Sequence, residues 1–168
     1  GCLAGVAWWD IDKLSHARLV VDRRGRVLFV DDHGKACLSE AAGGDHHLSV
    51  PERVTAVALA EHHDAFGVGL TDGSILVWDA PGSAPAQWAL GAAVARLWLG
   101  PDGSVAIAQT RSGLVYALRR GVDAQTQLGT SRADKVQNDV RVAIHPRHGA
   151  AGVALPDFHI FLRAAALA

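Results

Sequence analysis

Short apolar runs separated by polar turns recur along this chain, and the clearest copy lies in its second quarter. There, apolar runs at 54–60, 65–70 and 75–79 are separated by short polar segments. Asp72 and Gly73 stand between two of these runs, and Asp-Gly between apolar runs is typical of a β-hairpin, because glycine adopts positive φ without steric cost. The runs are too short for ordinary helices, so the pattern predicts antiparallel strands joined by tight turns.

The same order of runs and turns is found in three other segments of the chain. A period of roughly 40–45 residues with several short strands per unit is typical of a propeller blade. The turn residues that mark this repeat are Gly25, Gly73, Gly113 and Asp157. We therefore predict an all-β, propeller-like fold of about four blades, in a single domain over 1–168. The expected blades span approximately 6–38, 54–90, 94–128 and 140–163, with polar insertions at 39–53 and 129–139.

The segment Asp72–Asp79 resembles the end of a repeat of the WD40 family. In that family a turn aspartate precedes a tryptophan by six positions, and Asp72 and Trp78 match this spacing, with Asp79 completing the Trp-Asp pair. The resemblance implies that Asp72 and Trp78 belong to a structural hydrogen-bond network with a histidine, for which His46 or His47 is the candidate. It also implies a rigid platform that binds proteins or peptides on its rims and central faces, and few members of the family are enzymes.

The repeats end after the third strand of the fourth copy, and nothing before Val6 in the sequence supplies the missing strand. An open fan of sheets would leave strand edges and apolar faces uncovered. The sequence therefore predicts part of a larger ring, completed by a protein partner, by a second copy of this chain or by the rest of a longer protein. Closure as a small ring of four blades is the remaining alternative.

Composition narrows the class of partner and the compartment. The 168 residues carry 16 Lys and Arg against 17 Asp and Glu, a net charge of −1. This balance supplies no basic field for a phosphate backbone, so we do not expect nucleic acid as the partner. No run approaches the roughly 18 apolar residues of a membrane span. Cys2 and Cys37 are too few for a disulfide framework, and they predict reduced thiols in an intracellular, cytoplasmic protein.

Two histidine pairs are the main candidates for chemistry. His46-His47 and His62-His63 suggest zinc, but adjacent side chains in a strand point to opposite faces, so neither pair is a natural chelate. The sequence contains no Gly-x-Ser-x-Gly elbow and no phosphate-binding glycine loop. We therefore predict a protein-interaction scaffold that is not an enzyme and uses no metal or cofactor. The alternative is a propeller that binds a ligand or a metal and has an enzymatic role.

Turn residues supply the candidate binding surface. Turns between the second and third strands of successive blades lie on one face of a propeller. With the predicted strand order, this face brings together Arg23, Arg24, Asp72, Arg111 and Asp157. The arginines would suit an acidic patch on a protein partner. The alternative is that these residues are solvated turns with no binding role.

Overall fold

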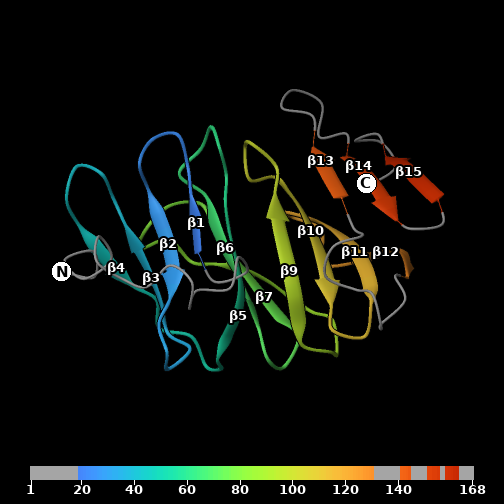
Figure 1. Ribbon diagram of the computed structural model, residues 1–168, viewed down its shortest axis with the longest axis horizontal. Coiled ribbons are helices and arrows are strands. Elements are labelled where there is room, and N and C mark those ends of the chain that lie inside the picture. The colour runs from blue at the N-terminus through green and yellow to red at the C-terminus, as the bar shows by residue number, and fades with distance from the viewer. Residues whose placement is uncertain (1–18, 131–140, 145–150, 156–157, 163–168) are drawn as a thin grey trace.

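The computed structural model describes residues 19–130, 141–144, 151–155 and 158–162. In these ranges the chain folds into four antiparallel sheets, which Figure 1 shows side by side in chain order. Each sheet follows the sequence from one edge strand to the other, and in the first three sheets along the chain each connection between strands is a hairpin turn. The predicted all-β architecture with blades of short antiparallel strands is confirmed.

The strands are grouped into blades as follows. Blade 1 contains β1 (Leu19–Val21), β2 (Val27–Val30), β3 (Ala36–Ser39) and β4 (Asp45–His47). Blade 2 contains β5 (Val54–Leu59), β6 (Phe66–Leu70), β7 (Ser74–Trp78) and β8 (Ala86–Ala89). Blade 3 contains β9 (Val94–Leu99), β10 (Val105–Thr110), β11 (Leu114–Arg119) and β12 (Thr126–Thr130). Blade 4 contains β13 (Arg141–Ile144), β14 (Ala151–Leu155) and β15 (Phe158–Leu162).

Blade 1 differs from the sequence prediction in its strand order. The segment 39–53 was predicted as an insertion, but Asp45–His47 forms the outer strand β4, where His47 pairs with Cys37 and the Ser39 hydroxyl donates to Asp45 at 2.7 Å. An outer strand pairs on one side only and is half in solvent, so it needs no apolar alternation. The hairpin at 22–26 therefore joins the first two described strands of the blade. The predicted strand at 6–9 lies outside the described residues.

Antiparallel pairing divides the turns between two ends of the molecule. We call the end with the turns at 22–26, 60–65 and 100–104 the first-turn end, because each follows the first strand of its sheet. The opposite end, with the turns at 31–35, 71–73 and 111–113, is the second-turn end. A backbone hydrogen bond from His62 N to Pro101 O, 2.8 Å long, joins neighbouring blades at the first-turn end.

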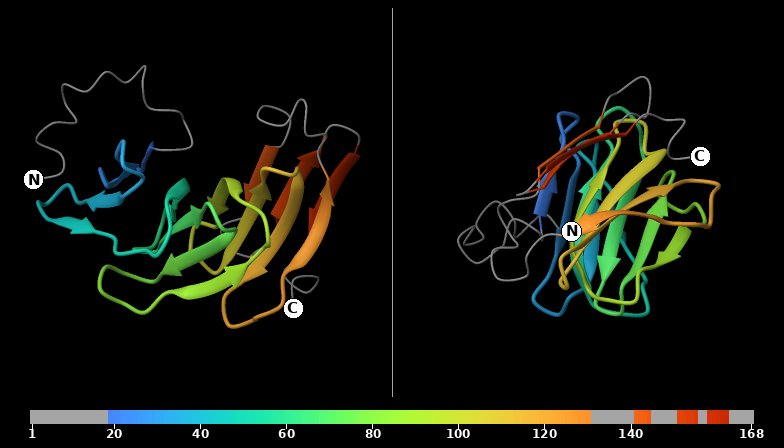
Figure 2. Two further views of the ribbon diagram at one scale, coloured as in Figure 1. Left: turned by 90° about the horizontal axis from the view of Figure 1, so that it is seen from below. Right: turned by 90° about the vertical axis from the view of Figure 1, so that its right-hand side faces the viewer.

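Apolar side chains fill the two spaces between blades 1, 2 and 3. One buried cluster joins blades 1 and 2, and a second joins blades 2 and 3, where β5 and β9 lie against each other. In Figure 2 these blades fan out side by side. Gly69 permits the close approach of blade 3, because a Cβ at this position would lie 2.4 Å from Cγ1 of Val94. Packing between faces of adjacent sheets thus makes blades 1 to 3 a rigid support for their turns.

Two expectations drawn from composition bear on this fold. Cys37 is buried in β3 and is disulfide-bonded, so the predicted reduced thiol is wrong for this residue. Its bonding partner lies outside the described residues. In the ranges that the structure describes, no helix has the length and apolar character needed to cross a membrane.

Candidate interaction site

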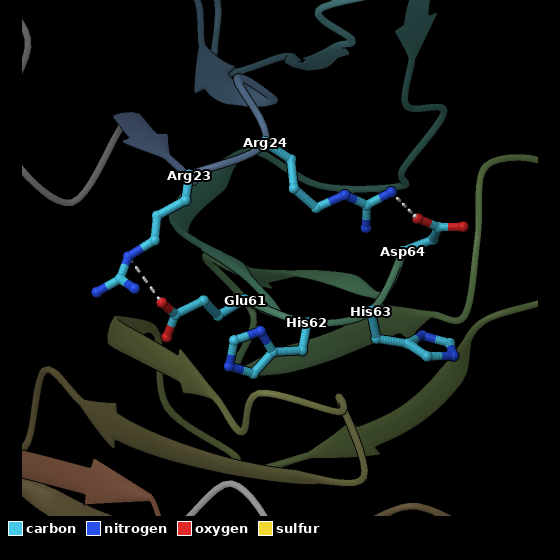
Figure 3. A pocket seen from close by; sticks show the side chains of 6 residues that line it. All are labelled: Arg23, Arg24, Glu61, His62, His63 and Asp64. Atoms are coloured by element: carbon cyan, nitrogen blue, oxygen red, sulfur yellow. Dashed lines mark ion pairs between the residues drawn. The ribbon is translucent and has the colours of Figure 1, made fainter.

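A pocket of about 490 Å³ opens at the first-turn end, between blades 1 and 2 (Figure 3). The β1–β2 turn supplies Arg23 and Arg24, and the β5–β6 turn supplies the other four side chains. The lining residues are Arg23, Arg24, Glu61, His62, His63 and Asp64. All six are charged or carry an imidazole, so the pocket offers ionic contacts and hydrogen bonds. We call it the turn pocket.

Arg26, next to the turn pocket, is buried and fixes the two turns to each other. Its side chain is 5% exposed and its Nε donates to the Asp22 carboxylate at 2.7 Å. Nη2 donates to the carbonyl oxygens of Ala60 and His63 at 2.8 Å each, and Nη1 donates to the Asp64 carbonyl at 2.9 Å. The guanidinium therefore ties blade 1 to three backbone carbonyls of blade 2. Such multiple hydrogen bonds are what a buried charge requires.

Asp22 completes this buried anchor. Burial by itself would raise the pKa of the Asp22 carboxyl, but hydrogen bonds from the side chain and backbone of Arg26 hold it below its usual value. The same carboxylate accepts hydrogen bonds from the backbone N–H of Arg24 and of Arg26, each at 2.9 Å. It thereby shapes the turn that carries the two exposed arginines.

The two arginines of the turn pocket form exposed ion pairs. Arg23 Nε lies 3.1 Å from Glu61 Oε1, and Arg24 Nη2 lies 2.7 Å from Asp64 Oδ1 (Figure 3). The hydrogen bond from Arg24 is the main cause that lowers the pKa of the Asp64 carboxyl. The side chains of Arg23 and Arg24 are 86% and 49% exposed, so solvent screens both pairs. These pairs can exchange partners at little cost.

His62 and His63 stand in the turn between the two acidic residues. Figure 3 shows their rings pointing away from each other, and both side chains are exposed. In the described part of the chain, no group of three or more His, Cys, Asp or Glu side chains is arranged to hold a metal ion. The arrangement at His62-His63 thus offers imidazoles to an incoming ligand, each from a separate direction.

The predicted binding face is divided between the two ends of the molecule. Arg23 and Arg24 lie at the first-turn end, whereas Asp72 and Arg111 lie in turns at the second-turn end. The expectation that all of them share a face is therefore wrong for Arg23 and Arg24. The error arises from the strand order of blade 1: the turn at 22–26 follows the first described strand of its sheet, whereas it was predicted to follow the second. In an antiparallel sheet, successive turns lie at opposite ends, so a shift by one strand moves a turn to the other end. Asp157 lies outside the described residues.

The predicted structural motif has a different set of contacts from the network that the resemblance implies. Asp72 accepts hydrogen bonds from the backbone N–H and the hydroxyl of Ser74, at 2.8 and 3.0 Å. Trp78 is buried and stacks on Phe66, with ring centroids 5.1 Å apart. Asp79 forms an ion pair with Arg120 of blade 3. Asp72 thus shapes its own turn, while Trp78 and Asp79 contribute to packing within and between blades.

A histidine was expected to complete that network. His46 lies in the outer strand β4, and its Nε2 is 3.6 Å from Glu40 of the same hairpin. The contact belongs to blade 1 alone, so His46 serves the β3–β4 hairpin. His47, the other candidate, pairs with Cys37 in the β3–β4 ladder.

Sequence reasoning missed Arg26 and the pairing of Glu61 and Asp64 with the turn arginines. A signal for Arg26 exists in the sequence, since Asp22 and Arg26 flank the turn glycine Gly25 at the ends of two strands. The pairing with Glu61 and Asp64 depends on which turns share an end. That relation follows from the strand order, which was predicted wrongly because the polar strand β4 was taken for an insertion.

Four-stranded antiparallel sheets in chain order, with the first strands of adjacent sheets in contact, define a β-propeller type of fold. No protein-family model and no curated protein matches the chain. It is similar to a chain in the solved structure "Crystal Structure of Mitotic Checkpoint Complex", with a TM-score of 0.66 and 14% identity, over 89% of this chain and 49% of that chain. It is also similar to Kluyveromyces lactis Hsv2, with a TM-score of 0.59 and 13% identity, over 80% of this chain and 51% of that chain. The chain spans about half the length of these two, and at such identities the likeness shows the fold alone.

Proposed function

We propose that this chain is a WD40-like propeller segment that acts as a protein-interaction module without a catalytic role, and that the turn pocket is a docking site. The observation that carries the proposal is the contrast between the buried arginine beside the pocket and the exposed cationic and imidazole side chains that line it. A buried arginine holds the two turns together, while two exposed arginines and two exposed histidines face solvent around the opening. A fixed frame with exchangeable charges is suited to recognising a charged protein surface.

Preorganisation supplies the mechanism of docking. Because Arg26 fixes the β1–β2 turn against the β5–β6 turn, a partner meets the pocket already formed and little backbone order is lost on binding. Acidic side chains of the partner replace Glu61 or Asp64 at the arginines, and its basic side chains take up the released carboxylates. Arginine is enriched among the residues that contribute most to protein interfaces.

A protein suits this pocket better than a small ligand or a metal. Sites for small molecules are lined mainly by apolar and aromatic side chains, whereas all six side chains here are charged or carry an imidazole. A metal requires several ligands that converge on one point, and the two histidine rings diverge (Figure 3). One solved neighbour is a chain of a complex, the mitotic checkpoint complex, which is in keeping with a role in assembly.

Charge-swap variants test the proposal against a purely structural role of the ion pairs. The tagged protein is used to capture partners from an extract of its host, with quantification by mass spectrometry. The variants are R23E/R24E, the swapped R23E/R24E/E61R/D64R, and D123R, which reverses an exposed charge in the β11–β12 turn outside the pocket. We expect the wild type and D123R to capture the same partner proteins, and we expect R23E/R24E and the swapped variant to fail to capture them.

The swapped variant separates the two roles. It restores both ion pairs with reversed polarity, so a merely structural role predicts that capture returns to the wild-type level. Docking on the arginines predicts that capture stays low although the thermal midpoint recovers. Equal capture by the wild type and all variants would overturn the assignment of the turn pocket as a docking site.

A further inference from the structure

We propose that the second-turn end of blade 1 carries a separate binding site for an acidic peptide segment of a protein partner. The site is a pocket of about 550 Å³ between the β2–β3 turn and the link from β4 to β5. We call it the Lys35–Arg53 pocket; its lining includes His33, Lys35, Leu48, Val50, Glu52 and Arg53. It lies at the opposite end of blade 1 from the turn pocket and shares no residue with it.

Backbone hydrogen bonds fix both walls of this pocket. Leu48 N donates to Ala36 O at 3.0 Å, which holds the start of the link against β3. Val54 N donates to Gly34 O at 2.9 Å, which holds the end of the link against the β2–β3 turn. The two ends of the link are therefore tied to the same strand pair, so the pocket is present before any ligand binds.

Arg53 lies directly over Gly34. A Cβ at Gly34, whose φ is +80°, would be 2.8 Å from Arg53 Nε and 3.0 Å from Arg53 Cβ. The arginine side chain therefore rests on bare backbone, where any larger residue would displace it. This contact places the Arg53 side chain against the turn that also carries Lys35.

The two cations of the pocket have no partner among the residues that the structure describes. Neither the Lys35 nor the Arg53 side chain has a hydrogen bond or an ion pair in the described part of the chain. Both are exposed, as is His33. This is the opposite of the turn pocket, where Arg23 and Arg24 are both paired with carboxylates.

Two of the three nearby acidic residues have partners other than the two cations. Asp31 accepts hydrogen bonds from the backbone N–H of His33 and Lys35, at 2.8 and 2.9 Å, and so shapes the turn. Glu52 accepts a hydrogen bond from the Thr71 hydroxyl of blade 2 at 3.4 Å. Asp32 is exposed at the tip of the turn and is not part of the pocket lining. Within the described residues, none of these three carboxylates is paired with Lys35 or Arg53, although Glu52 lines the same pocket.

The chemistry of the walls specifies the ligand further. Leu48 and Val50 are half-buried and pack against the core between blades 1 and 2, and Pro51 adjoins them. An apolar wall beside two unpaired cations is complementary to a peptide in which acidic side chains flank an apolar one. Arginine favours carboxylates because its planar fork forms two parallel hydrogen bonds with them. A segment with Glu or Asp on both sides of Leu or Val fits this pattern.

Fluorescence anisotropy with labelled peptides tests the proposal on the full chain. The probe is a fluorescein-labelled peptide with two glutamates flanking a leucine, and the matched control peptide carries lysines in place of the glutamates. We expect the acidic peptide to bind the wild type in low salt, to bind at least about tenfold more weakly to K35E/R53E, and to lose affinity as salt rises. The lysine peptide should not bind.

Variants at the other positions make the test specific. R111E removes a cation of the same end outside the pocket, and R23E/R24E alters the turn pocket, so both should keep wild-type affinity for the acidic peptide. K35Q and R53Q, which remove one charge each without reversing it, should weaken binding by an intermediate factor. This proposal would be overturned if the acidic peptide did not bind the wild type in low salt, or if it bound K35E/R53E equally well. Neither result would affect the proposal that the turn pocket is a docking site.

Discussion

The two ends of blade 1 differ in whether their cationic side chains have partners. At the first-turn end, Arg26 is buried with four hydrogen bonds and the exposed Arg23 and Arg24 each have a carboxylate partner. At the second-turn end, Lys35 and Arg53 are exposed and unpaired within the described residues. The same blade thus pairs its arginines with groups of blade 2 or of its own turn at one end, and at the other end it presents two cations that have no partner among the described residues. A cation therefore supports the fold where it is buried and hydrogen-bonded, and it is open to a ligand where it is exposed.

Burial decides which of these charges matters for stability. An exposed ion pair contributes about 0–1 kcal/mol, because water and salt screen it and two long side chains lose freedom. Removing one partner from a buried pair leaves an uncompensated charge, at a cost of about 3–5 kcal/mol. By this measure Arg26 is the central residue of the first-turn end. The exposed arginines beside it are available for binding.

The largest effect is expected from Arg26→Met. This change keeps most of the volume but leaves the buried Asp22 without its partner and three carbonyls of blade 2 without their donor. We expect a loss of about 3–5 kcal/mol in the free energy of unfolding, measured by denaturant titration. Arg24→Met, two positions away on the exposed side, is the matched control and should cost less than about 1 kcal/mol. Equal losses in the two variants would contradict the division between buried and exposed charges.

Asp22→Asn sharpens the same comparison through pH. The change replaces a charged hydrogen-bond acceptor of Arg26 by a neutral amide, and we expect a loss of about 2 kcal/mol at pH 7. The pKa of Asp22 is lower in the folded chain than in the unfolded chain, so its contribution is present above about pH 4 and is lost as pH falls through the folded pKa. The unfolding midpoint should therefore drop less between pH 5 and pH 3 in the variant than in the wild type. An identical drop would show that the Asp22–Arg26 pair is not the titrating element.

The architecture was accessible from the sequence because its signals are local. Apolar runs of strand length, Asp-Gly turns and a period of roughly 40–45 residues predicted hairpins in chain order, and β5 to β7 lie where the pattern of the second copy indicates. Gly73 has a φ of +91° in its turn, as a hairpin glycine requires. Each of these features depends only on residues close in the sequence.

The candidate sites were not accessible in the same way, because they depend on strand order. The strand Asp45–His47 has no apolar residue and looks like a loop in the sequence, yet it is the outer strand of blade 1. Because this strand was not predicted, Arg23 and Arg24 were predicted at the wrong end of the molecule. Residues such as Lys35 and Arg53, which are separated by a full hairpin, come together only once this strand is placed. Long-range pairing of polar turns leaves no periodic signal.

At the second-turn end, Gly34→Ala is expected to have a smaller effect that extends to binding. Positive φ disfavours alanine by about 1 kcal/mol, and the added Cβ would collide with the Arg53 side chain. We expect a loss of about 1–2 kcal/mol in stability together with weaker binding of the acidic peptide. Gly43→Ala is the matched control, since Gly43 has a φ of +91° and nothing within 4 Å of its added Cβ. The Gly43→Ala variant should lose a similar amount of stability, because positive φ disfavours alanine there too, and it should keep full affinity for the acidic peptide. Reduced affinity in both variants would refute the role of Gly34 in placing Arg53.

The smallest effect should come from neutralising the exposed pairs of the turn pocket. In R23Q/R24Q both ion pairs with Glu61 and Asp64 are lost, but the Arg26 anchor and the packing between blades 1 and 2 remain. We expect the free energy of unfolding to fall by less than about 1 kcal/mol at low salt. At about 1 M salt the difference from the wild type should vanish, because the screening length is then near 3 Å. Denaturant titrations of both proteins at two salt concentrations measure this, and a loss that persists at high salt would mean that Arg23 and Arg24 support the fold through packing rather than charge.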